Sequence, residues 1–147
     1  MLAVREWRHA AYSTCCLVTL LVILLIAFIA RVTGQILVVL FQPRWLPPMK
    51  DWYSGLMPYR YLLPSQIAII VLMVAMIRQV AGDPPPNRPL AHFILGFAAL
   101  YVTAMIVRFV IRRRRHPALR WYEGGMIPII FHWVLAGFLV AYALSRF

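Results

Sequence analysis

The fold of this chain is decided by residues 89–145, which read PLAHFILGFAALYVTAMIVRFVIRRRRHPALRWYEGGMIPIIFHWVLAGFLVAYALS. Residues 89–107 carry no charged side chain over 19 positions, and residues 124–145 carry none over 22. A bilayer core about 30 Å thick takes roughly 20 helical residues, so each segment is long enough to cross it. Between them lie Arg112, Arg113, Arg114 and Arg115, whose charges are too costly to bury in hydrocarbon. This stretch therefore predicts a membrane hairpin with an arginine-rich turn at one surface.

The composition agrees with a membrane protein. Hydrophobic residues make up 63% of the 147, and the mean hydropathy is +0.79, whereas soluble domains are nearer 45–50% apolar. In lipid every backbone polar group must be satisfied internally, which favours helices, and the alternating pattern of barrel strands is missing. The sequence predicts an all-α polytopic protein with a single membrane domain.

Two further apolar segments precede the hairpin. Residues 11–30 follow a short basic head, but this run is longer than the 7–15 residues of a secretory signal core and lacks its cleavage pattern, so we expect a retained helix. Residues 62–77 form the other segment, with Pro64 in its first turn, where proline is tolerated. The sequence therefore predicts an antiparallel bundle of four transmembrane helices over residues 11–30, 62–77, 89–107 and 124–145.

The end of the first helix is left open. Residues 35–41 are apolar again after Arg31 and Gly34. A helix over residues 11–41 would be ~46 Å long, which exceeds the bilayer core. Either it protrudes, with Arg31 extending to the surface, or it kinks near Gly34.

Residues 43–61 differ in kind from the apolar segments. Four prolines forbid a continuous helix, and Trp and Tyr favour the head-group level, where a ring is half apolar and half wet. We therefore expect an interfacial loop that places Trp45, Trp52 and Tyr53 at the membrane surface.

The formal charge of +11 indicates topology control more than nucleic-acid binding, because the cations lie between apolar spans. With four spans, ten cations fall on the side of the arginine-rich turn and five on the side of both termini. The positive-inside rule then predicts a cytoplasmic turn and external termini, in a bacterial inner membrane. Arg112, Arg113, Arg114 and Arg115 are expected to bind anionic lipid head groups or an acidic partner.

Residues for catalysis are lacking. The only acids lie at or beyond the ends of the spans, which disfavours a proton- or cation-coupled transporter; they are Glu6, Asp51, Asp83 and Glu123. No catalytic triad, phosphate-binding glycine loop or metal-binding spacing occurs. Cys15 and Cys16 are adjacent and form no redox motif. The sequence therefore predicts no catalytic residue and no metal site.

Small residues suggest where helices meet. His92 begins a face that continues through Gly96, Ala99 and Thr103 at helical spacing, and Ala136 and Gly137 lie in the last span. Such residues let a neighbouring helix approach closely. We therefore expect an accessory or assembly subunit that packs against other subunits of a photosynthetic or respiratory membrane complex. A small-molecule or lipid transporter is a further alternative.

Histidines offer another interpretation. Residues 92–108 (HFILGFAALYVTAMIVR), with glycine four and arginine sixteen positions after the histidine, resemble a helix of b561-type membrane cytochromes, as does His132 followed by tryptophan. The resemblance implies a haem b electron-transfer subunit with His92 and His132 as matching positions. The two should differ in height by more than ~10 Å across the bilayer core, too far for one iron. His9 lies on the same side as His92 and could meet it. The predicted cofactor is thus either none or haem b.

Overall fold

The computed structural model describes residues 2–48, 52, 59–82, 85–115, 117 and 126–147, with side chains described from Thr14 onward except that of Tyr59. The described part is all-helical and consists of α1 (Leu2–Phe41), α3 (Tyr59–Ala81), α4 (Arg88–Arg115) and α5 (Met126–Leu144). Each of these four helices includes a segment that is long and apolar enough to cross a membrane. The prediction of an all-α protein with four membrane-spanning helices is confirmed.

Local backbone chemistry explains where two of the helices end or begin. At the end of α1, Gln42 adopts a positive φ of 44° and its N–H donates to the carbonyl of Val38 at 3.2 Å. This is a left-handed cap, and Pro43 follows it because proline cannot continue the helix. At the start of α4, the side-chain oxygen of Asn87 accepts a hydrogen bond from the N–H of Leu90 at 3.1 Å, as an N-cap residue does.

The question left open for the first helix is resolved. α1 is one unbroken α-helix of 40 residues through Gly34, and its length of ~60 Å exceeds the thickness of a bilayer. In α3, Pro64 lies in the second turn because the helix already begins at Tyr59. A proline so close to the start removes only the hydrogen bond to the carbonyl of Arg60, and the helix continues.

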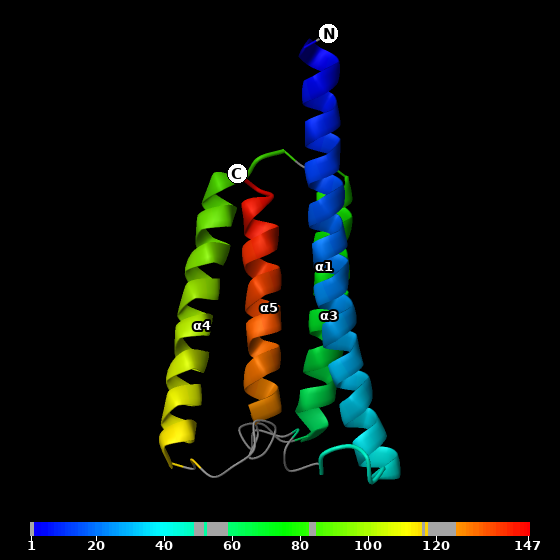
Figure 1. The fold of residues 1–147 in the computed structure, drawn as a ribbon, viewed down its shortest axis with the longest axis vertical. Helices are drawn as coiled ribbons and strands as arrows, with labels where there is room; N and C mark the ends of the chain where they lie inside the picture. The colour runs from blue at the N-terminus through cyan, green and yellow to red at the C-terminus, as the bar shows by residue number, and fades with distance from the viewer. Residues whose placement is uncertain (1, 49–51, 53–58, 83–84, 116, 118–125) are drawn as a thin grey trace.

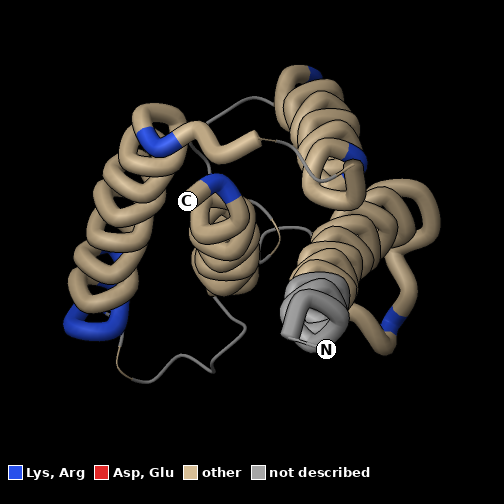
Figure 2. Tube along the Cα trace, turned by 90° about the horizontal axis from the view of Figure 1, so that it is seen from above, with Lys and Arg blue, Asp and Glu red and all other residues tan. Residues whose placement is uncertain are grey.

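The four helices form an uneven bundle. α5 lies in the middle, with the α1–α3 pair on one side and α4 on the other (Figures 1 and 2). α1 and α3 contact each other and α5, whereas α4 contacts α5 alone among the described helices. Successive helices are antiparallel, so both ends of the chain lie towards the same end of the bundle (Figure 1). Among the described helices, α4 is therefore kept in the bundle by its packing on α5 and not by contacts with α1 or α3.

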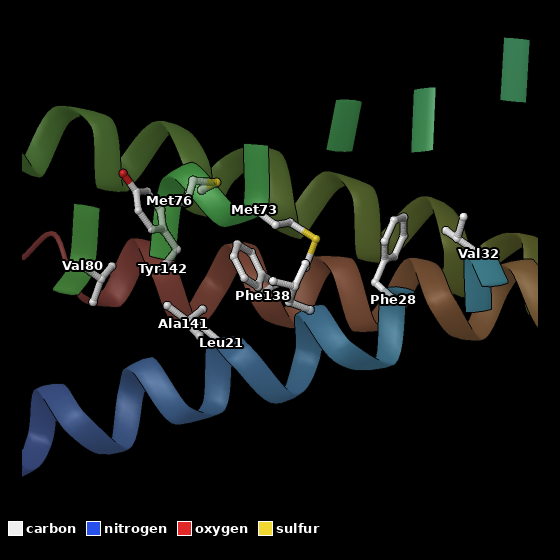
Figure 3. Close-up of a cluster of buried hydrophobic side chains, with 10 residues drawn as sticks. Leu21, Phe28, Val32, Met73, Met76, Val80, Phe138, Ala141 and Tyr142 are labelled. Carbon is white, nitrogen blue, oxygen red and sulfur yellow. The ribbon is translucent and has the colours of Figure 1, made fainter. Parts of the chain in front are cut away.

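The core lies where α1, α3 and α5 meet. Phe138 of α5 is fully buried and lies beside Leu21 of α1 and Met73 of α3, in a cluster that continues along α1 to Phe28 (Figure 3). Tyr142 extends this cluster, and its hydroxyl donates to the Gln79 side-chain oxygen at 2.6 Å. Because lipid tails are as apolar as these side chains, close packing holds the helices together more than the hydrophobic effect does.

A candidate polar pocket within the membrane-spanning helices

Three polar side chains of α1 and α3 are buried. Arg31, Gln35 and Gln66 are exposed by only 6%, 1% and 3%. Arg31 and Gln35 are four residues apart, so they share one face of α1. Gln66 of α3 donates from Nε2 to the Oε1 of Gln35 at 3.0 Å. At ~1.5 Å per residue, Arg31 lies about 15 Å from the end of α1 at Phe41, well inside the apolar span.

Arg31 and Gln66 border a cavity of about 230 Å³ that all four helices line, and Gln35 is joined to this wall by its hydrogen bond with Gln66. Its polar wall includes Arg31, Ser65 and Gln66, and Tyr101 and His132 complete it from α4 and α5. The remaining lining is mostly apolar and aromatic: Phe28, Trp52, Leu62, Ile69, Pro128, Phe131 and Leu135. An apolar cavity with a few convergent polar groups is typical of a binding site for a small molecule.

Tyr101 and His132 form one unit of the wall. The Tyr101 hydroxyl and the Nδ1 of His132 share a hydrogen bond of 2.7 Å, and the two rings pack edge to face with centroids 5.4 Å apart. The tautomer of the imidazole decides which of the two donates. In either case Nδ1 is engaged, so Nε2 is the ring nitrogen left for another partner.

Several polar atoms in the pocket wall, or directly beside it, lack a hydrogen-bond partner within the described part of the chain. They are the Nε of Arg31, the Nε2 of Gln35 and the Oε1 of Gln66. The Arg31 guanidinium carbon lies 5.7 Å from the ring centroid of Phe131, a cation–π contact that compensates part of the burial. Buried polar groups are normally satisfied, and an ionisable side chain inside a membrane span usually marks a functional site.

The charge of the pocket is positive. Arg31 is the permanent cation of its lining, and the segments of α1, α3, α4 and α5 that line it contain no aspartate or glutamate. The hydroxyls of Ser65 and Tyr101 and the amide of Gln66 add neutral polar groups. Together they suit a ligand that offers oxygen acceptors, above all an anionic one.

The histidines proposed for haem do not face each other. His92 is exposed near the start of α4, where its Nδ1 donates to the carbonyl of Arg88 at 2.7 Å and its ring packs on Phe147. His132 contacts Tyr101, nine residues further along α4, which is a difference in height of ~13 Å. The side chain of His9 lies outside the described residues. The described residues hold no group of three or more metal-ligating side chains. Among the described residues that line the pocket, His132 is the one histidine.

The small residues chosen for helix contacts lie in different environments. Ala136 is 1% exposed. A Cβ added at Gly96 or Gly137 would meet nothing within 4 Å. Ala99 and Thr103 are also exposed, and the Thr103 hydroxyl donates to the carbonyl of Ala99 at 2.8 Å. The face from Gly96 to Thr103 is therefore not covered by another described helix of this chain.

The residues expected at the membrane surface also differ in their exposure. Trp45 is 77% exposed, and the arginines at 112–115 form the last turn of α4. Trp52, in contrast, is only 7% exposed and donates from Nε1 to the carbonyl of Pro47 at 3.0 Å. It packs against Gly34, because this position has no side chain to occupy the space. Trp52 thus lines the pocket instead of facing lipid, and Tyr53 lies outside the described residues.

Sequence reasoning missed most of this pocket. Extension of Arg31 to the surface was one of two alternatives for the first helix, and none of Arg31, Gln35, Gln66 and Tyr101 was predicted from the sequence to be a site residue. A signal existed, since Arg31 and Gln35 are polar residues four apart in an otherwise apolar span. Tyr101 carried no comparable signal, because an isolated tyrosine in an apolar helix is common.

Comparison with protein-family models, with curated proteins and with solved structures finds no match to this chain.

Proposed function

We propose that this integral membrane protein binds a small amphiphilic molecule with an anionic head group in the pocket around Arg31. The observation that carries the proposal is the buried guanidinium beside a cavity lined by all four helices. An arginine inside a membrane span is costly unless a partner compensates its charge. A carboxylate or phosphate oxygen compensates it best, because charge-assisted hydrogen bonds are about twice as strong as neutral ones.

The size of the pocket limits which ligands can fit it. Its volume of about 230 Å³ is below the ~300–1,000 Å³ typical of sites for drug-sized molecules. A single carboxylate or phosphate head group fits this space, with an acyl tail continuing between the helices towards lipid. A haem would need the pocket to widen considerably.

The test is binding of defined amphiphiles to the purified protein. We expect a long-chain fatty acid and a lysophosphatidic acid, but not a neutral monoacylglycerol, to raise its thermal unfolding temperature. Because a hydrogen bond to a charged group contributes about 1.5–3 kcal/mol, Arg31→Gln should weaken binding by roughly 10- to 100-fold. The matched control is Arg44→Gln, which removes the same charge from an exposed side chain and should bind like the wild type.

Three outcomes would contradict this function. Equal stabilisation by the neutral lipid would remove the role of charge, and unchanged binding by Arg31→Gln would remove the role of the pocket. A Soret absorption band lost in His132→Ala would instead assign the pocket to haem b and favour an electron-transfer subunit.

The second candidate function is an accessory or assembly subunit of a larger photosynthetic or respiratory complex. The favouring observation is that α4, among the described helices, packs on α5 alone and leaves Gly96, Ala99 and Thr103 exposed. Small residues on an uncovered helix face suit close contact with a helix of another subunit. The excess of cations on the side of the arginine-rich turn supports placing that turn in the cytoplasm of a bacterial cell.

Purification in mild detergent followed by mass spectrometry tests this second candidate. We expect larger membrane proteins to co-purify with the wild type and to be lost in Gly96→Leu, because the added side chain separates the helices. The control is Ala68→Leu, which enlarges an exposed small residue on α3. A wild type that purifies alone, or equal loss in both variants, would contradict the subunit role.

A further inference from the structure

We propose that the last two turns of α4 hold the head group of an anionic phospholipid in a groove formed by Arg108, Arg112 and Arg115. This site is separate from the pocket around Arg31 and does not depend on the function proposed for it. The groove has a volume of about 450 Å³ and is lined by Ala104, Val107, Arg108, Ile111, Arg112 and Arg115.

The spacing of these residues places them on one helix face. Positions three and four apart are neighbours on an α-helix, so Arg108, Arg112 and Arg115 follow one another along a single stripe. Val107 and Ile111 line the groove beside them. A surface with apolar side chains followed by guanidinium groups matches a phospholipid, whose acyl chain ends in a phosphate.

The length of α4 sets these arginines at the depth of the head groups. The helix has 28 residues, from Arg88 to Arg115, which is ~42 Å. A bilayer with both head-group regions measures about 40–45 Å. When Arg88 lies at one surface, the last turn of α4 therefore lies at the opposite one, level with lipid phosphates.

An unsatisfied donor points to a ligand at this place. The Nε of Arg112 is buried and has no hydrogen-bond partner among the described residues. The planar guanidinium group binds phosphate oxygens with two parallel hydrogen bonds, which a lysine cannot do. A phosphate in the groove would also reduce the repulsion between neighbouring arginines.

Arg113 and Arg114 provide an internal control. Both are exposed residues of the same helical turn, and neither lines the groove. If attraction to an anionic surface were merely a matter of total charge, all four arginines from 112 to 115 would contribute alike. If the groove binds the head group, Arg112 and Arg115 should contribute much more to the affinity for the lipid than Arg113 and Arg114 do.

The experiment is native mass spectrometry of the purified full chain titrated with phosphatidylglycerol, with phosphatidylcholine as the neutral lipid. Because each basic residue near an anionic surface contributes about fivefold in affinity, Arg112→Gln with Arg115→Gln should weaken binding about thirtyfold. Arg113→Gln with Arg114→Gln removes the same charge but leaves the groove intact, because neither residue lines it, and should weaken binding less than about threefold. Val107→Trp should also weaken binding, since it fills the groove without changing any charge.

The remaining outcomes would overturn the proposal. Equal loss in the two double variants would show attraction by charge alone, and equal binding of both lipids would show that the head group is not recognised. Competition by glycerol 3-phosphate at the concentration of the lipid would assign the groove to a soluble anion. If the arginine double variant does not fold, Val107→Trp decides, and unchanged lipid binding by it contradicts the site.

Discussion

Replacement of Phe138 by alanine is expected to lower the free energy of unfolding by about 3 kcal/mol, at the lower end of the usual cost of truncating a buried phenylalanine. Phe138 is 0% exposed and lies where α1, α3 and α5 meet (Figure 3). Removing its ring leaves a cavity next to Leu21 and Met73. In a membrane, close packing is the main force between helices, so the loss of these contacts is not offset by the surrounding lipid.

The measurement is unfolding of the purified protein in mixed micelles by increasing denaturing detergent. Phe93→Ala is the control, because Phe93 is 72% exposed on α4. Truncation there should change the unfolding free energy by less than ~0.5 kcal/mol. Similar losses in both variants would show that Phe138 does not hold the three helices together.

Replacement of Gly34 by leucine is expected to cost about 2 kcal/mol, within the range measured for overpacked cores. A Cβ at this position would lie 2.7 Å from the Cη2 of Trp52, which is closer than a Cβ approaches a carbon atom that is not bonded to it. Any movement of the indole away from the new side chain breaks the hydrogen bond from its Nε1 to the carbonyl of Pro47, which adds to the cost. We therefore expect Trp52 to leave its place, which opens the wall of the pocket that it lines.

Two measurements check this prediction. The unfolding temperature should fall, and binding of a long-chain fatty acid should weaken because the pocket loses one side. Gly137→Leu is the matched control, since a Cβ added there meets nothing within 4 Å, and it should leave both quantities near those of the wild type. Unchanged stability of Gly34→Leu would contradict the packing of Trp52 against α1.

The two candidate sites differ in how they depend on the fold. The pocket around Arg31 exists only when four helices and Trp52 are assembled, whereas the groove at the end of α4 is made by one helix. Gly34→Leu should therefore weaken fatty-acid binding and leave the binding of phosphatidylglycerol unchanged.

The sequence by itself determined the integral-membrane class and the four helices that are long and apolar enough to cross a membrane. These depend on hydrophobic length and charge along the chain, which are local properties. It also indicated that His92 and His132 lie at different heights in the membrane, because both positions are set by distance along a helix.

Only the tertiary structure decided which side chains meet. Arg31, Gln66 and His132 come from three helices, and their convergence depends on the rotation of each helix about its axis. Burial of Trp52 against Gly34 and the outer position of α4 likewise depend on how helices and loop pack. In a chain whose spans are apolar on nearly every face, hydrophobic periodicity does not mark the inner side. Close contacts between particular side chains select it instead.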